Sequence, residues 1–167
     1  MTWQRNSSLN KQRATPSEAR KKLERYCAYQ DRCHQEVRRK LYDLGLYGED
    51  ADHVMAQLIE DKFLDEERFA RSYARGKHKI KGWGRYRIER ELKQRQISRY
   101  CIKAALSELD ELDYLGSLRS LLIKRYAKQA NDLHPYARRQ DLVQYALRKG
   151  YTTAESVAMA KEVVDEG

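Results

Sequence analysis

The feature that most constrains the fold is a regular succession of helix start and stop signals. Residues 15–18 (TPSE) combine a hydroxyl N-cap, a proline at the first helical position and a glutamate three residues after the cap, which is a capping box. Residues 152–155 (TTAE) form a second box, and Gly45 and Gly150 stand where helices are expected to end. Apolar residues between these signals recur at helical spacing, and no segment alternates as a strand would. We therefore expect an all-α protein of nine helices.

The spacing of apolar residues also predicts which side chains face the core. A helix over residues 34–44 is expected to be followed by one over residues 50–60. Later helices are expected to be capped by Asp65, to end near Arg95 and to begin at Ser98. The side chains expected inside are Leu23, Tyr26, Cys27, Val37, Leu41, Leu44, Val54, Met55, Leu58, Ile59, Phe69, Ala70, Tyr73, Ala74, Ile88, Leu92, Ile102, Ala105, Leu106, Leu109, Leu115, Leu118, Leu122, Tyr126, Leu142, Tyr145, Ala146, Val157, Ala160 and Val164.

Three segments, at residues 37–46, 88–97 and 142–151, share one apolar pattern. Each has a second apolar or alanine residue four positions after the first and another nine positions after it, and the segments begin 51 and 54 positions apart. Chance self-similarity is the alternative, but a period of about 50 residues corresponds to three helices, and such units stack because none buries both faces alone. We expect three tandem three-helix repeats stacked into an elongated, curved array. The expected boundaries are a disordered N-terminal tail at residues 1–14 and repeats at 15–62, 63–112 and 113–167, the second of them basic.

The positive charge of the chain is concentrated in one stretch. Residues 68–103 carry thirteen basic and two acidic residues, a local net charge of +11, whereas the whole chain has a net charge of +9. This density of one sign indicates contact with a polyanion or an acidic protein groove, although a solvated helical surface has a similar composition. The residues expected to bind nucleic acid or a protein partner are Arg68, Arg71, Arg75, Lys77, Lys79, Lys81, Trp83, Arg85, Arg87 and Arg90.

Trp83 stands between Gly82 and Gly84 at the break between two predicted helices. A tryptophan in this position either stacks on a base or docks into a partner, or else it fills a gap between repeats. The two glycines are weak evidence for a phosphate-binding loop, because no strand or P-loop surrounds them. The sequence leaves these alternatives open.

No arrangement of residues predicts catalysis, a metal site or a cofactor. The three cysteines, Cys27, Cys33 and Cys101, share no zinc-ligand spacing with one another or with the four histidines. The acidic run at residues 65–67 suits the first turn of a helix, where the macrodipole favours carboxylates. No apolar run approaches the roughly 18 residues of a membrane span. We therefore expect a cytoplasmic protein that does not bind a membrane.

The residues from Phe63 to Leu106 resemble a known family. They read FLDEERFA at 63–70, KGWG at 81–84 and RIEREL at 87–92, followed by Ile97, Ser98, Ala104 and Leu106, and EVRRKL at 36–41 is a second match. This pattern resembles the RecX regulatory-protein family, and with the repeat the resemblance covers about residues 19–164. Gln96 stands where the family usually has glycine, and Cys33 where it usually has a serine N-cap.

The resemblance implies a modulator of the RecA recombinase, active in the regulation of DNA repair and recombination. Members of the family bind in the groove of the RecA–DNA filament, span neighbouring protomers and usually lower its ATPase, strand-exchange and co-protease activities, although a few activate. The implied partners are the RecA filament and the phosphates of single- or double-stranded DNA, with the free protein a monomer. The alternative is a sequence-specific helix-turn-helix repressor that places residues 85–95 in the major groove.

Overall fold

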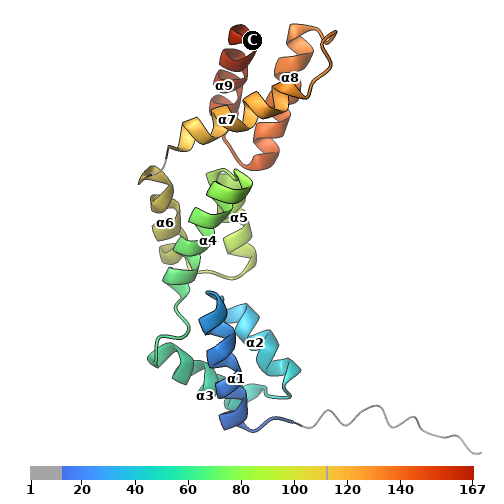
Figure 1. Ribbon diagram of the computed structural model, residues 1–167. Helices are drawn as coiled ribbons and strands as arrows, with labels where there is room; N and C mark the ends of the chain where they lie inside the picture. The colour runs from blue at the N-terminus through green and yellow to red at the C-terminus, as the bar shows by residue number, and fades with distance from the viewer. Residues whose placement is uncertain (1–12, 112) are drawn as a thin grey trace, which may run out of the picture. The chain divides into compact units, whose positions relative to one another are not determined.

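The computed structural model describes residues 13–111 and 113–167 (Figure 1). Within these residues all regular secondary structure is helical, which confirms the predicted all-α class. Most of the tail predicted to be disordered, residues 1–12, lies outside the described residues. The elements are α1 (Pro16–Tyr29), α2 (His34–Asp43), α3 (Gly48–Glu60), α4 (Glu66–Lys81), α5 (Arg85–Gln94), α6 (Arg99–Ser107), the 3-10 helix η1 (Glu108–Glu111), α7 (Tyr114–Ala127), α8 (Pro135–Lys149) and α9 (Thr153–Glu166).

Both predicted capping boxes are confirmed. The Glu18 N–H donates to Thr15 Oγ1 at 3.2 Å, and the Thr15 N–H donates to the Glu18 carboxylate at 3.3 Å. The corresponding bonds between Thr152 and Glu155 measure 3.1 and 2.9 Å. Gly150 ends α8 with a φ of 103°, a left-handed conformation that favours glycine.

The chain divides into two compact units between Glu66 and Glu67. In the first unit α1, α2 and α3 pack against one another. Their shared core includes Leu23, Leu41 and Leu58, all fully buried. This unit begins before the first helix, because Ala14 is buried and its N–H donates to the Leu44 carbonyl at 3.0 Å. Helix α2 starts at His34, after a Cys33 N–H that donates to the Glu36 carboxylate at 2.8 Å.

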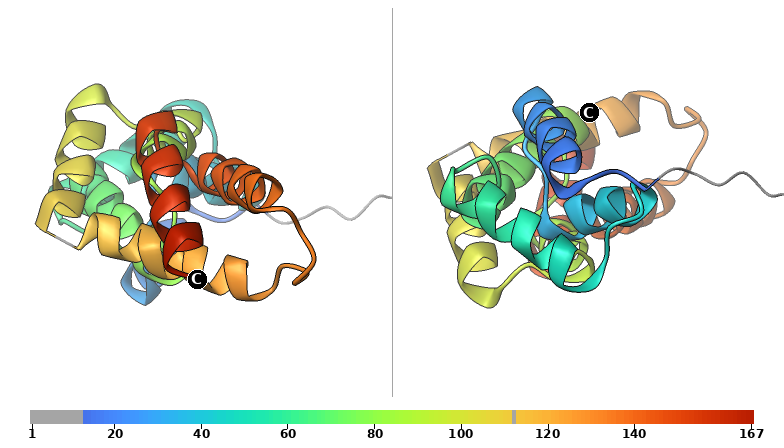
Figure 2. Two further views of the ribbon diagram at one scale, coloured as in Figure 1. Left: turned by 90° about the horizontal axis from the view of Figure 1, so that it is seen from above. Right: turned by 90° about the horizontal axis from the view of Figure 1, so that it is seen from below.

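The second unit contains most of α4 and all later helices. Helix α5 packs against α6, while α9 packs against both α7 and α8, which also contact each other (Figure 2). Ile88 and Leu92 of α5 are fully buried, as are Leu118 of α7 and Leu142 of α8. Apolar burial therefore extends through the whole unit.

The start of α5 and the end of α8 meet through their backbones. The Gly84 N–H donates to the Lys149 carbonyl at 2.7 Å, and the Tyr86 N–H donates to the Gly150 carbonyl at 3.0 Å. A Cβ added at Gly84 would lie 2.5 Å from backbone atoms of Gly150. Gly84 is thus explained by close backbone approach. Its amide is occupied within the chain, which removes the suggestion that this loop cradles phosphate.

Three core predictions were wrong. Ile59 is 45% exposed, and Leu115 and Val157 are each 51% exposed. The third helix also begins at Gly48, two residues before the predicted start at Asp50. Each of the three exposed side chains directly follows a buried residue in its helix, so each of the three burial predictions is displaced by one residue.

The side chains that replace Leu115 and Val157 in the core have specific partners. Tyr114 is buried because its ring stacks on His78, with centroids 5.2 Å apart, and contacts Tyr151 at 5.1 Å. Ser156 can be buried because its hydroxyl donates to the Thr152 carbonyl at 2.7 Å. Hydrophobicity alone would not select a tyrosine and a serine over leucine and valine.

Candidate nucleic-acid interface

Helix α4 carries most of the predicted basic residues and is held by an apolar face. Phe69, Ala70 and Ala74 are buried at helical spacing. Long basic side chains occupy the remaining faces, where their charged ends reach water while their stems cover apolar surface. Arg68, in the first turn, is exposed.

Arg71 and Arg75 form ion pairs with Glu108, a carboxylate distant in the sequence whose proximity was not predicted. Glu108, at the start of η1, accepts from Arg71 at 2.9 Å, and its other oxygen lies 3.1 Å from Arg75. Arg71 also donates to Glu67 at 3.1 Å. The hydrogen bonds from Arg71 and then Arg75 hold the pKa of Glu108 below its ordinary value. Both arginines are therefore partly neutralised within the chain.

Arg85 is also engaged within the second unit. Its guanidinium donates to Asp110 at 2.5 Å and lies 4.1 Å from the centre of the Tyr114 ring. A cation between a carboxylate and an aromatic face is well satisfied. Arg85 must give up these contacts to bind an external phosphate.

Trp83 is partly buried between α4 and α5 rather than presented as an open ring. The guanidinium of Arg87 lies 4.2 Å from its ring centre and the ammonium of Lys77 lies 5.0 Å from it. Tyr73 meets the indole edge-on at 6.4 Å. A base could take the place of Arg87 on the indole only by displacing that guanidinium.

Lys149, at the end of α8, joins this group of cations. Its ammonium donates to the Lys81 carbonyl at 3.0 Å, and Arg87 donates to the Arg148 carbonyl at 3.3 Å. Burial, and then repulsion by Arg87 and Lys81, lowers the pKa of Lys149. We call Lys77, Lys81, Trp83, Arg87 and Lys149 the basic junction.

None of the four cations of the basic junction has an acidic partner within the described part of the chain. Lys79 and Arg90 are exposed and likewise have no carboxylate partner among those residues. Apart from Arg68, the predicted cations therefore separate into arginines paired with Glu108 or Asp110, and cations without a carboxylate partner among the described residues. Of the latter, Lys77 and Arg87 contact Trp83. Lys149 was not predicted, because its position beside Lys81 depends on contacts between distant segments. The one signal in the sequence was the pair of basic residues directly before Gly150, at the predicted end of a helix.

The described residues contain no group of three His, Cys, Asp or Glu side chains able to hold a metal ion. No helix in the same residues is long and apolar enough to cross a membrane.

Comparison with known proteins identifies the family of the chain. The model of a domain described as "RecX, second three-helix domain" matches residues 65–106, which include most of the basic junction. The "Regulatory protein RecX" of Salmonella paratyphi A is 31% identical over 114 residues, covering 62% of this chain and 68% of that protein. The chain belongs to the RecX regulatory-protein family. The Escherichia coli (strain SE11) RecX protein is 28% identical over 137 residues, covering 76% and 80% of the two chains.

Solved RecX structures share the fold. The crystal structure of RecX from Lactobacillus salivarius has a TM-score of 0.74 at 20% identity, and covers 89% of this chain and 96% of that one. A second crystal structure, of a regulatory protein RecX, has a TM-score of 0.69 at 21% identity, covering 91% and 74%. The family expected from the residue pattern is confirmed by the Salmonella paratyphi A relative, and these structures confirm the helical fold.

Proposed function

We propose that this member of the RecX family is a non-enzymatic, cytoplasmic regulator that binds the RecA–DNA filament and lowers its ATPase, strand-exchange and co-protease activities. The observation that carries the proposal is that unpaired cations gather where the family domain matches, at residues 65–106. Lys149 adds a further cation from outside that range. A cluster of positive charge without acidic partners is suited to the phosphates of a nucleic acid.

The mechanism we propose is passive binding. The basic junction contacts DNA phosphates, with Arg87 suited to bidentate contacts and the lysines acting as point charges. Helices α1–α3 and helices α7–α9 contact adjacent RecA subunits. Inhibition follows if the protein binds one state of the filament more tightly than another, since a ligand shifts an equilibrium only by its differential affinity.

The proposal is tested by the double variant Lys77→Glu/Lys81→Glu. Its affinity for a labelled oligonucleotide should fall by at least about tenfold, and the salt dependence of binding should weaken, because phosphate contacts are lost. Inhibition of RecA ATPase on single-stranded DNA should be lost with it. A matched control, Lys21→Glu/Lys22→Glu on the exposed face of α1, carries the same charge change and should retain DNA binding. Unchanged DNA affinity together with unchanged RecA inhibition would refute the proposal.

The helix-turn-helix alternative requires basic side chains of α5 to reach base edges. Arg85 is held by Asp110 and Arg87 by Trp83, which leaves Arg90 as the arginine of α5 without such a contact. Phosphate binding is therefore favoured over base reading. Competition between oligonucleotides of equal length and different sequence should show little preference, whereas a repressor would select one of them by a factor of about a thousand or more.

A further inference from the structure

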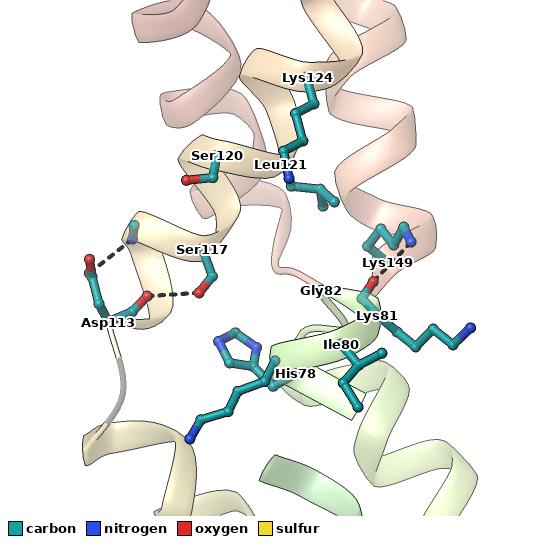
Figure 3. A pocket seen from close by; sticks show the side chains of 12 residues that line it. His78, Ile80, Lys81, Gly82, Asp113, Ser117, Ser120, Leu121, Lys124 and Lys149 are labelled. Atoms are coloured by element: carbon teal, nitrogen blue, oxygen red, sulfur yellow. Dashed lines mark hydrogen bonds between the residues drawn. The ribbon is translucent and has the colours of Figure 1, made fainter. Parts of the chain in front are cut away.

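A cavity of about 510 Å³ lies beside the basic junction, between the end of α4 and the exposed face of α7. Figure 3 shows Ser120 and Lys124 on α7 and, opposite them, His78 and Gly82 at the end of α4. This volume falls within the range of about 300–1,000 Å³ that is usual for small-molecule sites. It exceeds what a lone phosphate ion needs and suits a phosphate with its attached sugar.

The charge around the cavity is strongly positive. Lys79, Lys81, Lys124 and Lys149 line it, together with a single carboxylate, that of Asp113. The Asp113 carboxylate is already engaged as the N-cap of α7, where it accepts from the Gly116 N–H at 3.1 Å. Four ammonium groups around one occupied carboxylate repel one another, and an anion in the cavity would relieve that repulsion.

A buried histidine provides a second, independent indication of a ligand. His78 is 2% exposed, lines the cavity, and reaches from the end of α4 toward the first turn of α7 (Figure 3). Its Nδ1 lies 2.8 Å from the Trp83 carbonyl, which can only accept, so Nδ1 carries a proton. The opposite nitrogen, Nε2, has no hydrogen-bond partner within the described residues. Buried polar atoms of this kind usually have a partner.

We infer that this cavity is a binding site for a phosphate ester, occupied by one backbone phosphate and its sugar in a bound nucleic-acid strand. Lys124 and Lys149 supply charge, and the Ser120 hydroxyl is a hydrogen-bond donor to a phosphate oxygen. The inference rests on the proposed function, because it extends DNA contact from the basic junction onto α7. The same chemistry could be supplied by a free nucleotide, and the experiment separates the two sources.

The first measurement compares two charge reversals, one inside α7 and one at the residue that caps its C-terminus. Lys124→Glu places a carboxylate at the cavity, whereas Lys128→Glu makes the same charge change four positions further along, outside the cavity lining. Both side chains are exposed, so both variants should fold. Affinity for a short labelled oligothymidylate should fall about tenfold in the first variant and by less than about threefold in the second. Equal losses in the two variants would overturn the site.

The second measurement follows the ring resonances of His78 by NMR, assigned through their proximity to the Tyr114 ring. Trithymidylate should shift them to saturation at a lower concentration than thymidine 5′-monophosphate, which lacks the contacts of the neighbouring backbone, and inorganic phosphate should have little effect. Saturation by the monophosphate but not by the trinucleotide would overturn the nucleic-acid assignment in favour of a free phosphate ester. Resonances that none of the three probes moves would overturn the site altogether.

Failure of this inference differs from failure of the proposed function. If the cavity takes no phosphate, Lys124→Glu still binds DNA and still inhibits RecA ATPase like the unaltered protein. If the regulatory function is wrong, trithymidylate still shifts His78 while RecA ATPase is unaffected by the unaltered protein.

Discussion

Gln96, immediately after the end of α5, has a φ of 58°. A residue with a Cβ is strained in this left-handed region, and glycine is the usual solution at the end of a helix. The Gln96→Gly variant should therefore be more stable than the unaltered protein, by about 1 kcal/mol. Chemical denaturation followed by circular dichroism measures the change in the free energy of unfolding.

The control is the same substitution two positions earlier. Gln94 is the last residue of α5 and is exposed, so Gln94→Gly should lower stability by about 0.5 kcal/mol through lost helix propensity. If both variants were destabilised, the conformation at position 96 would not be the source of strain.

Two positions show which features of single residues could be predicted from the sequence and which could not. The absence of glycine at position 96 was visible in the sequence, because helix-end geometry depends on a few neighbouring residues. The burial of Tyr114 instead of Leu115 was not visible, because adjacent residues on a helix differ by only about 100°. The stacking of Tyr114 on His78 decides between them, and it joins segments 36 positions apart.

At the scale of elements, the meeting of α5 with α8 depends on one small residue. Gly84→Ala would place a methyl group 2.5 Å from the Gly150 backbone, so the two helix ends must separate. The two backbone hydrogen bonds between them would weaken, and we expect a loss of about 2 kcal/mol or more in unfolding free energy. Hydrogen exchange should show faster exchange at the Gly84 and Tyr86 amides.

Gly76 provides the matched control, because a Cβ added there meets no atom within 4 Å. It lies inside α4, where alanine is a better helix former than glycine, so Gly76→Ala should raise stability by about 1 kcal/mol. Equal effects of the two glycine-to-alanine changes would contradict the close-approach account.

Helices α7 and α8 are linked by a pH-dependent ion pair. Arg125 donates to both oxygens of Asp141, at 3.0 and 2.8 Å. This hydrogen bonding lowers the pKa of Asp141 to about 2. Because the folded-state pKa lies below the unfolded value, the contribution to stability is present above roughly pH 4 and is lost as the pH falls through about 2.

The variant Asp141→Asn should therefore be less stable at pH 7, and the difference from the unaltered protein should vanish near pH 2. Both side chains are more than a third exposed, at 38% and 35%, and after solvent screening we expect only about 1 kcal/mol. Asp132→Asn, at an exposed position without an ion-pair partner in the described chain, is the control and should show no such dependence. A constant difference between pH 2 and pH 7 would exclude the ion pair as its cause.

For the whole molecule, the number of charges could be predicted from the sequence. Which cations are left without a carboxylate partner, and so can bind phosphate, could not. The capping boxes were predictable because each needs only four consecutive residues. The basic stretch was predictable because it is a sum over residues 68–103. The pairing of Arg71 and Arg75 with Glu108 was not, and neither was the contact of Lys149 with Lys81 across 68 positions. Availability depends on tertiary contacts, which the one-dimensional pattern does not contain.

This distinction predicts how neutralising one acid should change DNA binding. In the variant Glu108→Gln, Arg75 loses its carboxylate partner at 3.1 Å and becomes available to phosphates, whereas Arg71 loses Glu108 but keeps Glu67. Affinity for duplex DNA should rise, and the slope of log K against log salt should steepen by about 0.9, the value for one added phosphate contact.

The control variant must change the net charge equally while leaving this region intact. Glu162→Gln does so, because Glu162 of α9 lies 3.7 Å from Arg119 of α7, outside the basic stretch. If the net charge of the protein governed binding, the two variants would gain DNA affinity equally and show the same salt slope. If the local supply of unpaired arginines governs it, only Glu108→Gln should steepen the slope. Equal slopes would show that Arg75 does not reach the DNA even when released.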